Sequence, residues 1–320
     1  MNSVTFQGVL AARRVVYQYL KPTALIHYPE LSELFGFQAH IKHENHQPTG
    51  SFKVRGGLNF MSQLPADQRD RGVITATRGN HGGSIAYAAK QFGVHATIVV
   101  PHGNNPEKNS AMRAFGAELI EHGVDFDESR ELCEKLQAER GFYYVHPANE
   151  PPLLHGVGTY SLEIFEELPE VDTIIVPIGA GSGACGAITV AQAINPNVKV
   201  IGVQAENAPS VYRSLKAGRK IETDSADTVA DGLATRVTFD LPLSILKDGI
   251  SQILLVSEEE IREAIRRALR YTHNLIEGAA AAPIAAACKL KAELADQNVV
   301  LIMSGANLDT ETLRWVLGKE

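Results

Sequence analysis

One lysine in this sequence has a setting that suits covalent chemistry. It lies in the segment HENHQPTGSFKVRGG, which follows a predicted strand at residues 38–42. Residues 48–50 form a predicted turn, and Thr49 or Ser51 is expected to cap the helix that follows. Lys53 then falls in the first helical turn, where the positive end of the helix dipole disfavours a second positive charge. Together with burial, this lowers the pKa of an amine, as a Schiff-base lysine requires.

Two further segments follow predicted strands and are rich in glycine. The segment TRGNHGGS (77–84) follows the strand predicted at 72–76, and GAGSGACG (179–186) follows the one at 172–178. Glycine lets the backbone approach a ligand closely, and the N–H groups at a helix start attract anions. The first segment suits a carboxylate, although an ordinary strand-to-helix turn is an equally good interpretation. The second predicts a phosphate site.

A serine closes the last predicted strand, 298–304, and opens the motif SGAN. A hydroxyl at a strand end is usually a cap or a turn residue. Ligands of parallel α/β sheets, however, bind outside the carboxyl ends of the strands. Ser304 is therefore one more polar group expected at the edge that carries Lys53 and the two glycine segments.

The segment 179–186 also fits a different cofactor. Gly181, Gly183 and Gly186 satisfy the pattern GxGxxG, and Glu206 lies twenty residues further on, at the end of a predicted strand. This spacing is typical of dinucleotide binding and would make the protein an NAD-type oxidoreductase. That alternative gives Lys53 no role, whereas a phosphate-bearing aldehyde cofactor needs both a lysine and a phosphate site.

The elements that carry these residues alternate along the chain. The predicted strands are 38–42, 72–76, 95–101, 172–178, 199–204, 251–256 and 298–304, and the predicted helices include 84–93, 257–272 and 282–295. This alternation predicts the α/β class with a mostly parallel sheet. The alanine-rich run 279–287 is broken by Pro283 and is expected to be a helix packed closely against a neighbour. Because 73–146 holds a β-α-β-α-β set of its own, we expect a small domain at 72–149 within a large one formed by 1–71 and 150–320.

The composition limits the compartment and the partners. The 320 residues carry a net charge of −7, which provides no basic surface for nucleic acid or an anionic membrane. Three widely spaced cysteines, Cys133, Cys185 and Cys288, form no disulfide framework. The N-terminus lacks a signal-peptide pattern, and no apolar stretch reaches the roughly 18 residues of a membrane span. We therefore expect a cytoplasmic protein whose partner is a small molecule.

Six motifs in one order carry a resemblance that covers nearly the whole chain. They are PTGSFKVRGG, TRGNHGGSIAYAA, PIGAGSGACG, TVADGLAT, EGAAAAP and SGAN. In this order they resemble the fold-type-II pyridoxal-phosphate enzymes, in the branch of the threonine/serine dehydratases and serine racemase. The resemblance implies two open, twisted, mostly parallel sheets covered by helices, with pyridoxal 5'-phosphate between a large and a small domain, and a homodimer.

The resemblance also implies a role for individual residues. Lys53 carries the cofactor as a Schiff base and moves the Cα proton, Phe52 lies against the ring, and Asn80 hydrogen-bonds its 3'-oxygen. Ser304 faces the pyridine nitrogen. The full cofactor set is Phe52, Lys53, Asn80, Gly179, Ala180, Gly181, Ser182, Gly183, Glu277 and Ser304, in which 179–183 bind the phosphate. The substrate set is Ser51, Thr77, Arg78, Gly79, Asn80 and His81.

The implied reaction is β-elimination of water from a small β-hydroxy amino acid, such as L-threonine or L-serine, to a 2-keto acid and ammonia. A neutral Ser304 at the ring nitrogen makes a weak electron sink, which favours elimination over transamination. A 3-hydroxyaspartate dehydratase and a serine racemase remain alternatives within the family. Because the sequence ends at residue 320, we expect no C-terminal regulatory domain.

Two positions depart from the family pattern. Arg78 stands where these enzymes usually carry a small Ser or Ala, and because arginine stays protonated, it is a poor second acid/base for racemisation. It could pair with a carboxylate of the substrate or point to solvent. Tyr212 replaces the second carboxylate of the branch's divalent-metal site, which leaves Glu206 as the only candidate ligand. We therefore expect no dedicated divalent metal.

Overall fold

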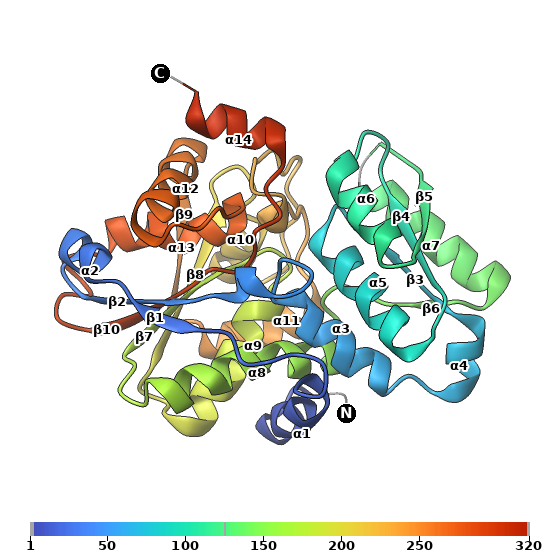
Figure 1. Ribbon diagram of the computed structural model, residues 1–320, viewed down its shortest axis with the longest axis horizontal. Coiled ribbons are helices and arrows are strands. Elements are labelled where there is room, and N and C mark those ends of the chain that lie inside the picture. Colours follow the sequence, from blue (N-terminus) through green and yellow to red (C-terminus); the bar gives the residue numbers. More distant parts are fainter. Residues whose placement is uncertain (1–2, 125, 319–320) are drawn as a thin grey trace.

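The computed structural model describes residues 3–124 and 126–318, which contain two separate β-sheets (Figure 1). The larger sheet has the order β1-β2-β10-β7-β8-β9. Its strands are β1 (Leu25–His27), β2 (Gln38–Lys42), β10 (Asn298–Ile302), β7 (Thr173–Pro177), β8 (Lys199–Ala205) and β9 (Gln252–Val256). The short edge strand β1 pairs antiparallel with β2, and the other neighbours are parallel.

Helices cover both faces of this sheet because its central strands are apolar on both sides. In β7, Ile174 and Val176 pack toward the cluster that contains α1 (Phe6–Val16), α8 (Pro151–Glu167) and α9 (Ser182–Ile194). Ile175 packs toward the opposite cluster, which contains α12 (Glu258–Thr272) and α13 (Gly278–Lys289). Near-continuous apolar strands are what a parallel sheet buried on both faces requires.

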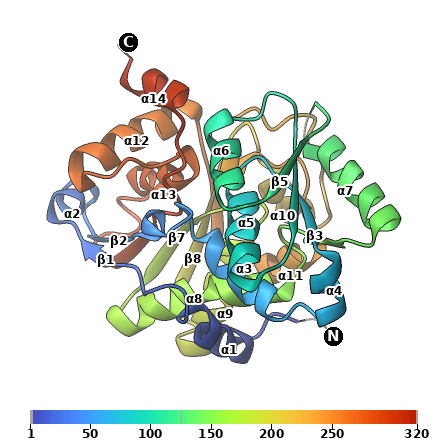
Figure 2. The ribbon, with the colours of Figure 1, turned by 45° about the vertical axis from the view of Figure 1, so that its right-hand side comes forward.

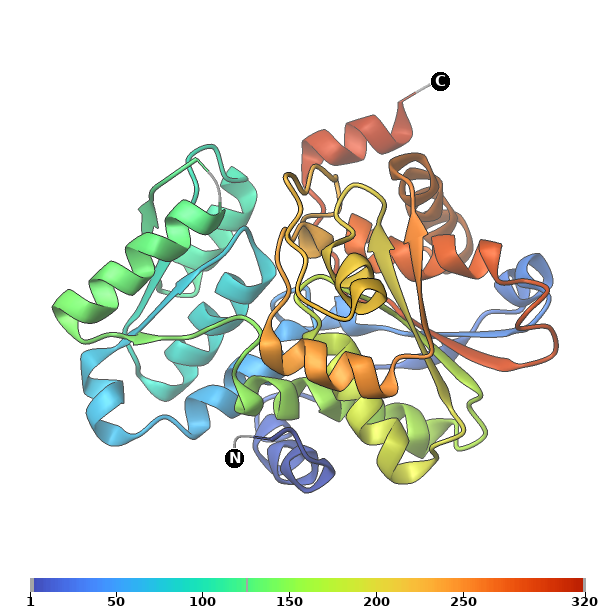
Figure 3. The same ribbon diagram turned by 180° about the vertical axis from the view of Figure 1, so that it is seen from behind.

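The smaller sheet is parallel and has the order β5-β4-β3-β6. Its strands are β5 (Glu118–Glu121), β4 (Ala96–Val100), β3 (Val73–Ala76) and β6 (Tyr143–Tyr144). The helices α5 (Asn80–Phe92) and α6 (Pro106–Ala114) lie on one face (Figure 1), and α7 (Phe126–Arg140) covers the other (Figure 3).

The helix that begins at Lys53, α3 (Lys53–Ser62), packs against both parts of the molecule (Figure 2). Its two glycines explain how closely it does so. A Cβ on Gly56 would lie 2.8 Å from the carbonyl oxygen of Leu153 in α8, and one on Gly57 would lie 2.4 Å from the hydroxyl of Ser84 in α5. The RGG of the motif therefore brings the backbone of α3 into contact with both neighbouring helices.

A buried ion-pair cluster holds the first turn of α3. The guanidinium of Arg55 donates to Glu44 at 2.7 Å and to Glu163 at 2.6 Å, and all three side chains are at most 1% exposed. Lys42 adds a second cation, 2.8 Å from Glu163. Two cations and two carboxylates thus neutralise one another inside the protein, as buried charges must.

The remaining elements are α2 (Pro29–Phe35), η1 (Glu44–His46), α4 (Ala66–Arg71), α10 (Ser210–Ala217), η2 (Asp231–Leu233), α11 (Asp240–Gly249) and α14 (Thr310–Leu317). Within the described ranges, no helix has both the length and the apolar character needed to cross a membrane.

All seven predicted strands are present, and two local predictions were correct only in part. The alanine-rich run is a closely packed helix, as predicted, but Pro283 does not break it: α13 starts at Gly278 and runs through the proline, and its residues 278–287 are buried. Packing on all sides outweighs the loss of one backbone N–H donor there. Of the two cap candidates, Thr49 does not cap α3, because its hydroxyl donates to the carbonyl oxygen of Ser51. The hydroxyl of Ser51 accepts from the N–H of Lys53, the first residue of α3, at 3.4 Å.

Candidate active site

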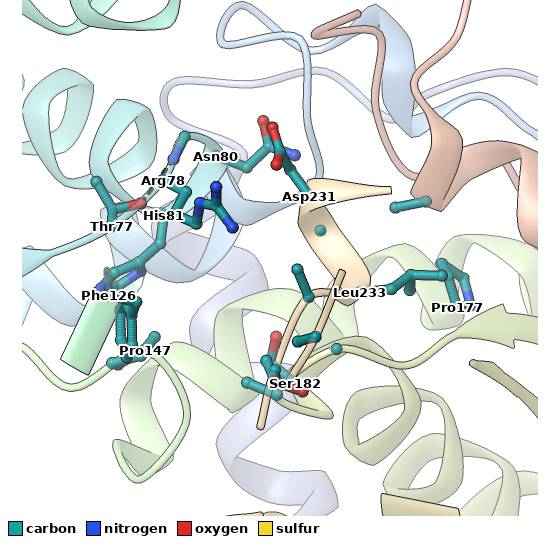
Figure 4. Close-up of a pocket in the computed structure, with 18 of the residues that line it drawn as sticks. Thr77, Arg78, Asn80, His81, Phe126, Pro147, Pro177, Ser182, Asp231 and Leu233 are labelled. Carbon is teal, nitrogen blue, oxygen red and sulfur yellow. Dashed lines mark hydrogen bonds between the residues drawn. The ribbon is translucent and has the colours of Figure 1, made fainter. Parts of the chain in front are cut away.

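A cavity of about 420 Å³ opens where the carboxyl ends of strands from both sheets meet. Figure 4 shows Thr77, Arg78, Asn80 and His81 on one side of it and Pro177, Ser182, Asp231 and Leu233 on the other. Lys53, Glu277 and Ser304 also line it. The cavity therefore collects residues from β3, β7 and β10 and from the start of α3.

The amine of Lys53 lies at the centre of this arrangement. Lys53 is the first residue of α3, and its Nζ donates a hydrogen bond of 2.7 Å to the hydroxyl of Ser182. Burial lowers the pKa of Lys53 to about 8, although Cys185 and Glu277 oppose the shift. An amine with this pKa is partly unprotonated near neutral pH, which nucleophilic attack on an aldehyde requires.

The segment 179–183 forms a backbone cradle at the start of α9. No hydrogen bond among the described residues uses a backbone N–H of 179–183 as its donor. Gly181 is in the left-handed region, with φ of +97°, and a Cβ on Gly179 would lie 2.1 Å from the carbonyl oxygen of Gly232. Free N–H groups at a helix N-terminus, held open by glycine, are a binding site for a phosphate.

A second set of free N–H groups lies at the start of α5. The hydroxyl of Thr77 accepts from the N–H groups of Gly79 and Gly82, at 3.0 and 3.2 Å. The backbone N–H groups of Asn80 and His81 have no hydrogen-bond acceptor in the described ranges. Burial lowers the pKa of His81 to about 3, so the imidazole is neutral, and its Nε2 lies 3.2 Å from the carbonyl oxygen of Val145. This turn suits a carboxylate.

Hydrogen bonds to Glu277 and Asn307 hold the side chain of Asn80 in place. Its Nδ2 donates to Glu277 at 2.7 Å, and its Oδ1 accepts from Asn307 at the same distance. Burial raises the pKa of Glu277. A Cβ on Gly305 would lie 2.5 Å from a carboxylate oxygen of Glu277, so the glycine of SGAN leaves room for that side chain beside Ser304.

The comparison with known families decides which cofactor this geometry serves. Residues 16–305 match the model of a family described as pyridoxal-phosphate dependent enzyme. The chain belongs to this family. L-threonine ammonia-lyase of Thermotoga maritima is 38% identical to it over 316 residues, which are 99% of this chain and 79% of the relative. The L-threonine ammonia-lyase of Geobacter sulfurreducens is 39% identical over 298 residues, 93% of this chain and 74% of the relative.

Solved structures of the family have the same fold. The processed form of threonine deaminase isoform 2 from Solanum lycopersicum superposes with a TM-score of 0.92 at 32% identity, covering 98% of this chain and 92% of that one. Maize serine racemase gives a TM-score of 0.93 at 29% identity, with coverage of 98% and 96%. The chain is therefore a fold-type-II pyridoxal-phosphate enzyme, as its motifs predicted.

The dinucleotide alternative loses its support. Gly186 serves the packing of two helices, since a Cβ there would lie 2.9 Å from Cα of Gly158 in α8. Glu206 is exposed at the end of β8 and is not among the residues that line the cavity. Two of the four residues on which that hypothesis rested thus have no place at the cavity.

The residues present fit pyridoxal phosphate. The amine of Lys53, whose pKa burial lowers, lies 2.7 Å from the hydroxyl of Ser182, one of the residues whose backbone N–H groups form the cradle. This arrangement matches an aldehyde and a phosphate on one molecule. Phe52 lines the same cavity, and its ring packs edge-on against Tyr160, whose hydroxyl donates to the carbonyl oxygen of Gly183 at 2.8 Å. Tyr160 therefore connects the ring of Phe52 to the backbone of the cradle.

Most of the predicted site residues come together, and one lies just outside. The cavity is lined by Phe52, Lys53, Thr77, Arg78, Gly79, Asn80, His81, Gly179, Ala180, Gly181, Ser182, Gly183, Glu277 and Ser304. Ser51 does not line it: the residue is buried, and its hydroxyl accepts from the N–H of Lys53 at 3.4 Å. In the described ranges, no three His, Cys, Asp or Glu side chains are grouped to hold a metal ion.

Sequence reasoning missed one pair on the cavity wall. Lys108 of α6 donates from Nζ to Asp231 of η2 at 2.5 Å, which links the two sides of the cavity. Asp231 belongs to the motif TVADGLAT, which the sequence singled out, but nothing in that motif indicated the contact with Lys108. Lys108 lies on an ordinary polar helix and carries no comparable signal.

Proposed function

We propose that this pyridoxal-phosphate enzyme eliminates water from a small β-hydroxy amino acid, such as L-threonine or L-serine, to give a 2-keto acid and ammonia. One observation supports this proposal above the others. The amine of Lys53 lies 2.7 Å from the hydroxyl of Ser182 at the phosphate cradle, and it shares its cavity with the turn at the start of α5 that suits a carboxylate. The relatives named as L-threonine ammonia-lyases support this class of reaction.

The proposed cofactor site uses residues that line the cavity. Lys53 would carry the cofactor, the N–H groups of 179–183 would bind its phosphate, and Phe52, Asn80 and Ser304 would surround its ring. When bound, pyridoxal phosphate supplies a conjugated system that stabilises negative charge on the substrate Cα. The hydroxyl of Ser304 is neutral and makes no hydrogen bond in the described ranges, so a ring nitrogen beside it would not be held protonated.

The protein's own groups then bind the substrate and move its proton. The free N–H groups of Asn80 and His81 hold the α-carboxylate at the start of α5. The amine of Lys53, with a pKa of about 8, takes the Cα proton as a general base. Departure of the β-hydroxyl with a proton gives an enamine, whose hydrolysis yields the keto acid and ammonia.

Arg78 makes racemisation the weaker candidate. Racemisation needs a second acid/base on the face of Cα opposite the lysine, and a guanidinium is not deprotonated in proteins. The similarity to maize serine racemase is close in fold, at a TM-score of 0.93. The residue at this position nevertheless supports elimination.

We also propose a division into a large domain of 1–71 and 150–320 and a small domain of 72–149, assembled as a cytoplasmic homodimer. The two sheets, whose strands fall on opposite sides of these boundaries, support the division. Free Cys133, Cys185 and Cys288 are compatible with a reducing compartment. Sedimentation of the purified protein tests the dimer.

The function is tested by adding L-threonine or L-serine to the purified, cofactor-loaded protein and measuring keto acid and ammonia. The loaded protein should absorb in the near-violet, and Lys53→Ala should lose both the band and the activity. Lys90→Ala, which removes an exposed lysine of α5, is the matched control and should keep both. A wild-type protein that takes up no cofactor and releases no keto acid from any β-hydroxy amino acid contradicts the proposal.

A further inference from the structure

Arg78 is a cation on the cavity wall that has no partner in the protein. It follows β3, lines the cavity, and keeps more than a third of its surface exposed. No hydrogen bond or ion pair formed within residues 3–124 and 126–318 includes its guanidinium, although the group has five N–H donors. Figure 4 shows Arg78 on the wall formed by the β3–α5 loop, facing the side that carries Asp231 and Leu233.

Four other charged groups that line the cavity have partners within the protein. Lys108 pairs with Asp231, Glu277 accepts from Asn80, and Arg236 donates to the carbonyl oxygen of Thr223. Asp227 also lines the cavity, as an exposed carboxylate that forms no ion pair with Arg78 in the described structure. Arg78 is thus a positive charge left available to whatever fills the cavity.

The α-carboxylate of an amino acid does not need this charge. The free N–H groups of Asn80 and His81 at the start of α5 provide a carboxylate site. A substrate with a neutral side chain would occupy the cavity and remove water from Arg78 without replacing its hydrogen bonds. Burying a guanidinium in this way is unfavourable, whereas a second carboxylate would accept two parallel N–H bonds from it.

We propose that the preferred substrate carries a second carboxylate on the carbon that bears the leaving hydroxyl, and that Arg78 binds it. The substrate class is a 2-amino-3-hydroxy dicarboxylic acid, and 3-hydroxyaspartate is its smallest member. Loss of the Cα proton and the Cβ hydroxyl as water forms the Cα–Cβ double bond. Hydrolysis of the resulting enamine takes up one water, so the products are a 2-oxo dicarboxylic acid and ammonia.

This inference rests on the proposed function, and its test separates the two. Wild type, Arg78→Ala and Arg78→Lys are assayed with L-serine, L-threonine and the stereoisomers of 3-hydroxyaspartate. Wild type should prefer one 3-hydroxyaspartate isomer. Arg78→Ala should lower kcat/KM for that isomer about 10- to 100-fold, the effect of a charged hydrogen bond, and should lower it more than kcat/KM for L-serine, so that the preference for that isomer over serine falls. Arg78→Lys should restore part of the loss.

A binding measurement that needs no turnover accompanies the kinetics. Calorimetry should give tighter binding of succinate than of butyrate to wild type, and Arg78→Ala should remove the difference. Arg113→Ala, an exposed arginine of α6 outside the cavity, is the control and should leave both unchanged.

The inference is overturned if serine or threonine is the best substrate and Arg78→Ala leaves the ranking as it was. It is also overturned if Arg78→Ala weakens all substrates equally, because Arg78 would then bind the α-carboxylate. Failure of every β-hydroxy amino acid, in contrast, contradicts the proposed function itself.

Discussion

The amine of Lys53 donates a hydrogen bond of 2.7 Å to the hydroxyl of Ser182, although 129 residues separate them in the chain. Lys53 opens α3 and Ser182 opens α9, so this bond joins the first residues of two helices. The position that would react with an aldehyde and the position that would bind a phosphate are therefore adjacent. Four measurements test what this arrangement implies.

The rate at which the cofactor-free protein takes up pyridoxal phosphate should depend on pH through Lys53. Burial lowers the pKa of this amine from 10.5 to about 8. Below pH 8 the amine is protonated and cannot attack the aldehyde, so the rate should fall about tenfold for each pH unit. Above pH 8 the rate should level off. The change in absorbance after mixing measures the rate, and a rate that keeps rising to pH 10.5 would show that the pKa is unshifted.

A methyl group on Gly179 should damage the phosphate cradle. The added Cβ would lie 2.1 Å from the carbonyl oxygen of Gly232, and a backbone atom cannot move aside cheaply. Gly179→Ala should lower the free energy of unfolding by about 1–3 kcal/mol and weaken cofactor binding. Gly83→Ala is the control, because nothing lies within 4 Å of its added Cβ. If the two variants have the same free energy of unfolding in urea and the same affinity for the cofactor, the steric argument for Gly179 is wrong.

Removal of Arg55 should destabilise the protein far more than removal of a comparable surface arginine. Arg55→Met leaves Glu44 and Glu163 buried without their main partner and should cost about 3–5 kcal/mol. Arg13→Met breaks a bidentate pair with Glu166, whose side chains are 35% and 48% exposed, and should cost under about 1 kcal/mol. Urea unfolding of both cofactor-free variants compares the two costs, and similar losses would contradict the buried-charge argument.

The pair of Lys108 and Asp231 should be energetically coupled. It is partly buried, with side-chain exposures of 11% and 34%, and it joins α6 to η2 across the cavity. A double-mutant cycle with Lys108→Met and Asp231→Asn should give a coupling of about 0.5–3 kcal/mol in unfolding. The exposed pair of Arg71 and Asp67 is the reference and should give about 0.5 kcal/mol or less. Additive effects at Lys108 and Asp231 would mean that the contact does not hold the cavity walls together.

The sequence by itself determined the class of the fold and the kind of cofactor. Strands such as 172–178 are apolar on both faces, which only a sheet covered on both sides can bury, and the structure has a strand at Thr173–Pro177. A lysine at a helix start and a glycine-rich turn after a strand are local signals, because helix ends present the same N–H groups in any fold. These signals placed Lys53 and 179–183 in the site before any distance was known.

Only the tertiary structure decided which of these residues meet. The last strand, β10, lies between β2 and β7 in the sheet, and this order brings Ser304 between the segments that carry Lys53 and Ser182. No local pattern reports such an order, since it depends on how the finished helices and strands pack. The same reason explains two details that differ from the predictions. Ser51 lies two residues from Lys53 yet outside the cavity, and Pro283 is tolerated because residues 278–287 of α13 are buried. The contact of Lys108 with Asp231 exists only because two separate sheets meet there.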